Sequence, residues 1–426
     1  MRHLPLAVAL AVAGPSGCSA SDSRPRDVPA TARQEATIAV IGGTVVAAPD
    51  QAPIRDAVVL IRDGRIAAVG ARSAIQVPGG ATIIDAAGGT VLAGFWNCHV
   101  HFSEPVWSGA ARAPADRLRP AIERTFTRWG FAHVVDTGSL PADTIALRRR
   151  IDAWELAGPS IRTAGIPLAP VKGTPIYVRE AGFQLPEPAS PEQARALVGD
   201  MAGQGVDAIK IFAASVMGRG QTPPVMSADV IAAIVDEAHR RELLVMAHPT
   251  NLPGLRAAVD GGVDIVLHTT PDGGPWPEGT ATWLVGRRAA LIPTLKLWDW
   301  ELERKKISPE VSERFRNVAI DQLRAFAAAG GTVLFGTDVG YMSDPDTTDE
   351  LRHMVAAGMT FPALLASLTT APAARFGASK RTGRIAPGLD ADLVIVEGDP
   401  AADPMALSRV RLTMRRGVTL WRTSPR

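Results

Sequence analysis

The chain has 426 residues, of which 46% are hydrophobic, and its formal net charge at pH 7 is +2. This length and composition are typical of a globular protein with one large domain or two. Acidic and basic residues are mixed along the sequence, so the charge pattern predicts no surface for nucleic acid.

Residues 1–20 have the features of a secretory signal peptide: a positively charged start and about ten apolar residues, too few to span a bilayer. Cys18 lies in a context similar to a bacterial lipoprotein processing site, although Pro15 stands where a branched aliphatic residue is usual. We expect export to the periplasm. The chain would then carry a lipid on Cys18, or be cleaved near Ala20 to leave a soluble protein. The Pro- and Ser-rich residues 21–36 are the expected linker.

Both ends of the remaining chain have β-strand patterns. Residues 37–92 contain short apolar runs, and the pair Asp63-Gly64 between two of them predicts a hairpin. Residues 380–426 repeat this pattern. We therefore expect one small, discontinuous β-sandwich domain made from the two ends.

Residues 93–379 alternate strand-like runs with helical stretches, which predicts an α/β fold. Eight such units fit a (β/α)8 barrel of the TIM type, in which active sites lie at the carboxyl ends of the strands. The predicted strands lie within residues 94–102, 131–139, 160–168, 206–215, 243–251, 263–271, 290–298 and 332–340.

The first of these strands contains two histidines in the stretch GFWNCHVHF. His99 and His101 point to the same face, because side chains alternate along a strand. Taken alone, the pair could bind a metal or be buried with hydrogen-bond partners. Three more residues with metal-binding side chains lie at the ends of later predicted strands, namely His248, His268 and Asp338.

Lys210 lies between two isoleucines in the fourth strand, where a buried cation is unfavourable. Its ammonium could extend to solvent at the strand end. The chain, however, has only six lysines among its 45 basic residues, and lysine can lose its proton where arginine cannot. A neutral lysine can react with carbon dioxide to give a carbamate, which can bridge two metal ions.

The motifs HVH, IKIF, MAHP, VLHT and GTD, in this order, resemble those of the amidohydrolase superfamily. The β-rich ends and the stretch GRIAPGLDADLVIVEGDP are also similar to that superfamily. The resemblance covers about residues 37–425. It is greatest to the binuclear-metal group that includes prolidase-like and imidazolonepropionase-like enzymes.

This resemblance implies a site with two divalent metal ions, with zinc the expected metal. His99, His101 and Asp338 would bind one ion and His248 and His268 the other, with carboxylated Lys210 (N6-carboxylysine) bridging both. A hydroxide between the ions would be the nucleophile. Asp338 would act as general base and then as general acid.

Three residues complicate this assignment. Asn97 stands where the family often has Asp, and Ala93 replaces a usual Pro. Asn97 shares a face with His99, so a residue at this position could support that ligand, and the change from Asp to Asn bears on this role. Lys296 is a second lysine in a predicted strand, but we favour Lys210 because it lies on the fourth strand.

The expected reaction is hydrolysis of a peptide-like amide, in a dipeptide or an N-acyl amino acid. One alternative is a mononuclear metal deaminase or a cyclic-amide hydrolase. Deaminases of this superfamily lack the lysine and carry a Glu soon after the fifth-strand histidine, whereas HPTNLPGL follows here. The other alternative is a metal- or ligand-binding lipoprotein without turnover.

The small-molecule substrate would need a cation for its carboxylate. Arg179 and Arg219, on predicted loops, are the candidates, and each could instead be a solvated surface residue. Tyr177, Trp298 and Tyr341 are the expected aromatic lining. The sequence predicts no oligomeric state.

Other polar residues of the central region are expected to be structural. His133 should pack with a hydrogen-bond partner, and Asp136 is expected in a turn or cap. His239 and His353 lie on helical stretches and are expected to be solvated.

Overall fold

The β-rich ends of the chain form two β-sheets in the computed structural model, which describes residues 37–218 and 220–423, and the second of these sheets combines strands from both ends. One sheet has the order β4-β3-β1-β5 and the other the order β16-β15-β14-β6-β2. The strands span Ile38–Ile41 (β1), Thr44–Val45 (β2), Ala57–Arg62 (β3), Arg65–Ala71 (β4), Thr82–Asp85 (β5), Gly89–Ala93 (β6), Leu393–Glu397 (β14), Val410–Arg415 (β15) and Val418–Arg422 (β16).

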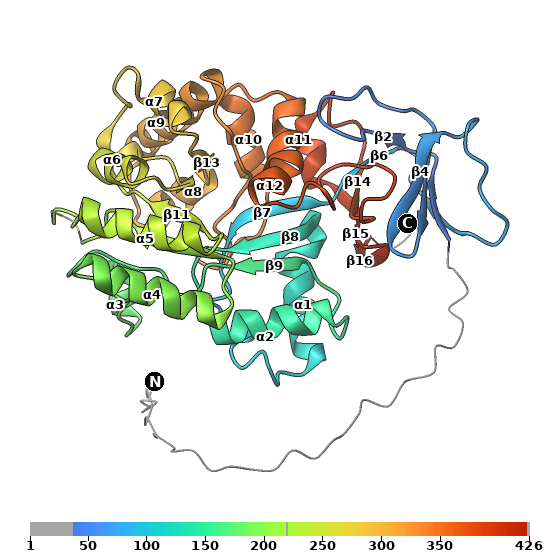
Figure 1. Cartoon of the computed structure of the whole chain (residues 1–426). Helices are drawn as coiled ribbons and strands as arrows, with labels where there is room; N and C mark the ends of the chain where they lie inside the picture. The colour runs from blue at the N-terminus through green and yellow to red at the C-terminus, as the bar shows by residue number, and fades with distance from the viewer. Residues whose placement is uncertain (1–36, 219, 424–426) are drawn as a thin grey trace, which may run out of the picture. The chain divides into compact units, whose positions relative to one another are not determined.

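The second sheet joins segments from opposite ends of the chain. β14 pairs antiparallel with β6, with Leu393 opposite Ala93, and the blue and red strands lie side by side in Figure 1. The predicted hairpin is confirmed. Asp63 and Gly64 both have left-handed φ angles, +49° and +73°, and connect β3 to β4.

The middle of the chain supplies a series of parallel strands. They pair in chain order within two groups, β7-β8-β9 and β10-β11-β12-β13, and a bridge between Leu168 and Ile211 connects the groups. Their bounds are Phe95–Val100 (β7), Phe131–Asp136 (β8), Ser160–Thr163 (β9), Ala208–Phe212 (β10), Leu244–His248 (β11), Ile265–Leu267 (β12) and Ala290–Ile292 (β13).

Residues 332–340 were expected to contain a regular eighth strand, but they make only isolated bridges. They still lie between β13 and β7. Leu291 N donates to Thr332 O at 3.0 Å, and Cys98 N donates to Phe335 O at 2.7 Å. At the far end of the segment, the amide of His101 donates to the carbonyl of Val339 at 2.8 Å. Hydrogen bonds therefore run from strand to strand around a closed ring.

Helices follow the strands and surround them (Figure 1). They are α1 (Ala115–Thr125), α2 (Pro141–Asp152), α3 (Ile176–Glu180), α4 (Pro191–Gln204), α5 (Ala228–Arg240), α6 (Leu252–Asp260), α7 (Thr280–Gly286), α8 (Leu295–Arg304), α9 (Pro309–Ala328), α10 (Thr348–Ala356), α11 (Phe361–Leu368) and α12 (Thr370–Arg375). Among the described residues, no helix is both long and apolar enough to cross a membrane. The predicted signal peptide, Cys18 and the linker lie outside these residues.

The predicted strand over residues 290–298 is wrong beyond Ile292. Pro293 interrupts the pairing, Thr294 takes a left-handed φ of +44°, and α8 begins at Leu295. Lys296 is therefore a helix residue. Its Nζ lies 2.7 Å from the Asp344 carboxylate, which connects α8 to the segment before α10.

Two histidine predictions have different outcomes. The partner expected for His133 is confirmed, because its Nε2 lies 3.0 Å from Asp392 Oδ2. The expectation that His353 is solvated is wrong. His353 is buried, and its Nε2 lies 2.5 Å from Asp299 Oδ2, because α10 packs against α8.

We predict that Gly336→Ala destabilises the protein by about 1–3 kcal/mol, because an added methyl group overfills a tightly packed site. A Cβ at this position would lie 2.4 Å from Ile292 Cγ2 and 2.8 Å from His99 Cβ. Chemical denaturation would measure the change. The control is Gly203→Ala in α4, where a Cβ has open space and Ala favours the helix. Equal stabilities of the two variants would contradict the prediction.

Candidate metal centre

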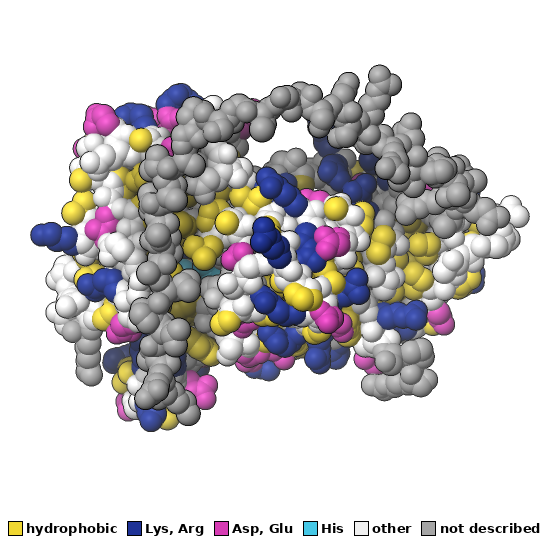
Figure 2. All heavy atoms as spheres, turned by 90° about the horizontal axis from the view of Figure 1, so that it is seen from below, with side chains coloured by type: hydrophobic (Ala, Val, Ile, Leu, Met, Phe, Trp, Pro, Cys, Tyr) yellow, Lys and Arg dark blue, Asp and Glu magenta, His cyan; other side chains and the backbone are white. Residues whose placement is uncertain are grey.

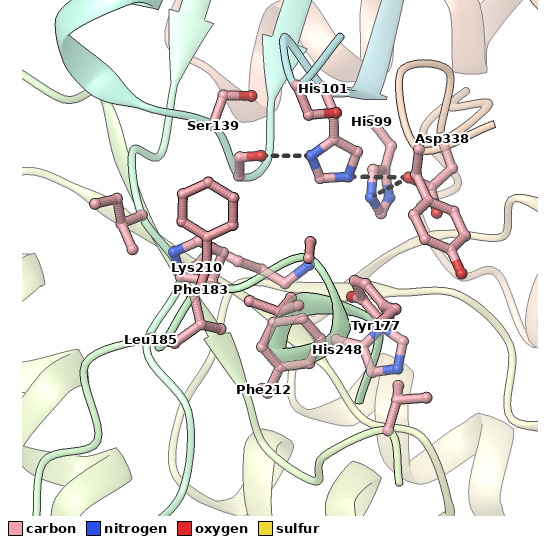
Figure 3. A pocket seen from close by; sticks show the side chains of 18 of the residues that line it. His99, His101, Ser139, Tyr177, Phe183, Leu185, Lys210, Phe212, His248 and Asp338 are labelled. Atoms are coloured by element: carbon pink, nitrogen blue, oxygen red, sulfur yellow. Dashed lines mark hydrogen bonds and ion pairs between the residues drawn. The ribbon is translucent and has the colours of Figure 1, made fainter. Parts of the chain in front are cut away.

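His99, His101 and Asp338 converge at the carboxyl end of β7. The Nε2 atoms of His99 and His101 lie 3.3 and 3.0 Å from Oδ1 of Asp338 (Figure 3). Candidate ligand atoms of the three residues all lie within 4.8 Å of one another. The strand alternation that predicted a shared face for the two histidines therefore brings both to one carboxylate.

The tautomer of His101 is fixed by the turn that follows β8. Its Nδ1 lies 2.7 Å from the carbonyl oxygen of Gly138, which can only accept, so Nδ1 carries the proton. Asp136 holds this turn by accepting hydrogen bonds from the Ser139 hydroxyl and the Gly138 amide. Asp136 is thus a turn residue, as expected. The Nε2 of neutral His101 is left with a lone pair directed at Asp338.

A second pair of imidazoles faces the first. The ring centroid of His268 lies 4.7 Å from those of both His99 and His248, and its Nε2 lies 4.0 Å from Asp338 Oδ2. Its Nδ1 lies 2.5 Å from the hydroxyl oxygen of Thr294, whose own proton goes to the carbonyl of Pro293. The Thr294 oxygen must therefore accept from Nδ1, which leaves Nε2 of His268 free to bind a metal.

Burial sets the charge of these side chains. Desolvation, together with the positive charge of Lys210, lowers the pKa values of His99, His248 and His268 well below the ordinary value. These imidazoles are neutral near pH 7, which is the state that binds metals. Burial also lowers the pKa of His101, but its hydrogen bond with Asp338 and the attraction of that carboxylate raise the pKa overall.

Lys210 lies on β10 and is 2% exposed. Burial lowers its pKa to about 8, although the charges of Asp338 and Asp136 act in the opposite direction. It forms no salt bridge within the described part of the chain, and its Nζ lies 5.2 Å from the Phe212 ring. A buried amine that is partly neutral near pH 8 has the reactivity needed for carbamate formation.

A divalent cation fits this arrangement. In neutral His101 the lone pair of Nε2 faces Asp338 Oδ1 at 3.0 Å, so only a proton or a metal ion can bridge the two atoms favourably. The site is buried, and a mixture of imidazole nitrogens and carboxylate oxygen suits zinc and related metals. Metal binding would therefore displace a proton from His101.

Two of these side chains depend on strained backbone. His268 and Asp338 have left-handed φ angles of +68° and +63°, which are unfavourable for residues other than glycine and are common at functional sites. Gly340 has a φ of +101°, and a Cβ there would lie 2.0 Å from the carbonyl oxygen of His101. The last glycine of the stretch GTDVG is therefore a sequence signal for the turn that follows Asp338.

The supporting residues were only partly foreseen. Asn97 is buried, and its Nδ2 donates to Thr337 Oγ1 at 2.7 Å while its Oδ1 accepts from the Thr337 amide. It connects β7 to the segment that carries Asp338. Sequence reasoning missed Thr294, because a threonine after a short apolar run carries no signal without knowledge of its neighbours.

A cavity of about 600 Å³ opens over these residues. Tyr177, Trp298 and Tyr341 line it, and a histidine is visible among hydrophobic side chains in a hollow in Figure 2. Arg179 is exposed and does not line the cavity, because Tyr177, Val178 and Ala181 occupy the inner side of the short helix α3. Arg219 lies outside the described residues.

The fold and this site define a metal-binding protein of the α/β class, and comparison with known proteins assigns the family. Residues 90–420 match the amidohydrolase family. The chain belongs to this family, whose members generally use divalent metal ions. It groups with the prolidase-like amidohydrolases and is an enzyme that hydrolyses C–N bonds. The resemblance seen in the sequence is thereby confirmed.

Individual relatives are distant but extend over most of the chain. An uncharacterized protein of Mycobacterium tuberculosis is 28% identical over 389 residues, 87% of this chain and 93% of that protein. An ochratoxinase of Aspergillus niger is 25% identical over 420 residues, 87% and 83% of the two chains. The structure of a Xaa-Pro dipeptidase with bound methionine is similar in fold, with a TM-score of 0.79 at 23% identity, covering 91% of this chain and all of that one.

We predict that Thr294→Ala weakens binding of one metal ion by about 10–100-fold, because His268 loses the acceptor that fixes its tautomer. Titration of the metal-free protein with zinc and a competing chelator would measure this. Thr294→Ser keeps the hydroxyl and should bind close to normally. An unchanged affinity in the Ala variant would show that the contact between Thr294 and His268 does not support the site.

Proposed function

We propose that the protein is a two-metal amidohydrolase that cleaves a peptide-like amide bond. One observation carries this proposal: His99, His101, His268 and Asp338 gather in a single buried site, in which burial lowers the pKa values of His99 and His268 well below the ordinary value. His99, His101 and Asp338 would hold one ion and His248 and His268 the other, with zinc the expected metal and Lys210, as its carbamate, bridging the two.

We also propose the domain organisation in which a (β/α)8 barrel spans residues 93–379 and a β-sandwich combines residues 37–92 with 380–426. The closed ring of hydrogen bonds and the pairing of β6 with β14 support it. Export through residues 1–20, with or without a lipid on Cys18, stays a prediction.

When bound, the metal ions supply Lewis-acid polarisation of the scissile carbonyl and lower the pKa of water. Asp338 accepts a proton from the attacking water as the water oxygen bonds to the carbonyl carbon. Asp338 then delivers that proton to the amide nitrogen, and the C–N bond breaks with its electron pair on nitrogen. The products are a carboxylic acid and an amine.

The residues around the reacting groups have separate tasks. Gly138 and Thr294 orient the imidazoles of His101 and His268. The backbone at Asp338 donates its amide to the carbonyl of His99 at 2.8 Å, which holds the carboxylate at the end of its segment. Burial limits water around Asp338, so the proton that it accepts is passed on to the substrate.

We predict two metal ions per chain by elemental analysis of the purified protein. Asp338→Asn should keep substantial metal but lose turnover by about 10²–10⁴-fold, because the amide cannot carry the proton. His99→Ala and His101→Ala should lose both metal and activity. The control is His239→Ala, which alters a half-exposed histidine on α5.

Suitable substrates are dipeptides, N-acyl amino acids and uncharged amides. Normal turnover of His99→Ala or His101→Ala would contradict the assignment of the ligands. A single metal ion together with an unmodified Lys210 would indicate instead a mononuclear enzyme, with deaminase-type substrates.

Lys210 should form a carbamate in the metal-free protein, and more of it as pH rises. Its lowered pKa leaves the amine mostly charged below about pH 8 and mostly neutral above it, and only the neutral amine reacts with carbon dioxide. Carbon-13 NMR with labelled bicarbonate, at constant dissolved carbon dioxide, would show a carbamate signal that grows between pH 6.5 and 8.5. Persistence of that signal in Lys210→Arg would contradict the assignment.

A further inference from the structure

The cavity over the metal centre is larger than the reacting amide requires. Its volume of about 600 Å³ lies within the range of pockets that enclose drug-sized ligands. The metal-binding side chains are a minority of the residues that line it. The groups attached to the scissile bond must therefore be selected by the remaining walls.

Most of the wall that faces the metal centre is apolar. Phe183, Leu185 and Phe212 gather across from His99, His101 and Asp338 in Figure 3. Phe183 is 61% exposed and Leu140, also in the wall, is 53% exposed. Large apolar side chains that line a cavity yet contact water are what an apolar ligand would bury.

Two further aromatic residues of the cavity wall are held in position. Tyr341 donates its hydroxyl to Glu301 Oε1 at 2.7 Å, and its ring packs 5.1 Å from that of Tyr177. The indole nitrogen of Trp298 donates to Thr269 Oγ1 at 2.9 Å. These contacts fix the orientation of two aromatic side chains that line the cavity, where an aromatic group of the substrate could pack against them.

The charged residues in the wall are mainly acidic. Apart from Asp338 they are Glu104, Asp143, Asp272 and Glu301. The cations among the described lining residues are Lys210, which belongs to the proposed metal site, and Lys305. Lys305 is paired with Glu301 at 2.7 Å. Glu104 is paired with Arg124 at 3.3 Å, so Asp143 and Asp272 are the lining carboxylates without an ion pair among the described residues. On this wall a substrate carboxylate would meet their negative charge without a free cation from these residues, which is unfavourable.

We propose that the enzyme acts on neutral amides that carry a bulky aromatic group and have no carboxylate next to the scissile nitrogen. This inference rests on the proposed function and narrows its substrate class. It also replaces the dipeptides and N-acyl amino acids that the sequence predicted. Arg179, one of the two arginines expected to bind a carboxylate, lies on the outer side of α3.

A matched pair of substrates tests the proposal. N-(2-phenylethyl)benzamide and N-benzoylphenylalanine differ only by the carboxylate on the carbon next to the scissile nitrogen. We expect the metal-loaded enzyme to hydrolyse the neutral amide with a kcat/KM at least about tenfold higher, because like charges repel in the acidic wall. Release of benzoate, which both substrates yield, would be measured by chromatography.

Variants test the role of the apolar wall separately. Phe183→Ala should lower kcat/KM for the neutral amide by about tenfold, mainly through KM, with unchanged metal content. The control is Val171→Ala, which truncates an exposed apolar residue outside the cavity lining. An unchanged KM in Phe183→Ala would show that this wall does not bind the substrate.

Several outcomes would overturn the proposal. One is a preference for N-benzoylphenylalanine that Arg219→Ala abolishes, because Arg219 would then be the carboxylate anchor. Another is cleavage of dipeptides but of neither benzamide, which would leave the proposed function intact. If the two-metal enzyme cleaves no amide at all, the proposed function is wrong and the substrate class fails with it.

Discussion

The hydrogen bonds between β7 and residues 332–339 are the constraint on which the metal centre depends. They close the ring of strands and at the same time bring the two ends of the ligand set together. The amide of Asp338 donates to the carbonyl of His99, and the amide of His101 donates to that of Val339. Because backbone atoms make these contacts, the pairing itself fixes the backbone positions of His99, His101 and Asp338, and their side chains need only adopt suitable rotamers.

Burial then gives the site its chemistry. Taking imidazoles and an amine out of water penalises their charged forms, which keeps His99, His248 and His268 neutral and lowers the pKa of Lys210 to about 8. Asp338 keeps its place because both histidines of β7 face it. The polar groups behind the ligands, in Gly138 and Thr294, leave the metal-facing nitrogens without protons. At His268, desolvation and the hydrogen bond from Nδ1 therefore favour the same neutral state, whereas at His101 the hydrogen bond with Asp338 opposes desolvation and raises the pKa.

The sequence predicted those features that depend on local order. Alternation along β7 placed His99 and His101 on one face, and the position of Asp338 at a strand end placed it near them. The sequence could not predict which neighbour each side chain would find. Thr294 meets His268 only because the chain turns sharply after Ile292. His353 is buried against Asp299 because two helices pack together.

The short helix α3 is a second feature that the sequence could not predict. Tyr177 and Arg179 are two residues apart, and in a loop either could reach the substrate. In a helix they point in different directions, so the tyrosine enters the cavity while the arginine is exposed. The helical conformation of these five residues thus determines that an aromatic side chain, and not a cationic one, lines the cavity at this point.

The pairing of β6 with β14 has a consequence for how the protein is made. The two strands are about 300 residues apart in sequence, so this sheet closes only after Leu393–Glu397 have been synthesised. Until then the apolar edge of β6 has no partner and remains open to association with other chains. Strand β14 thus completes a sheet that β2 and β6 begin, and synthesis that stops before Leu393 releases a chain that lacks this protection.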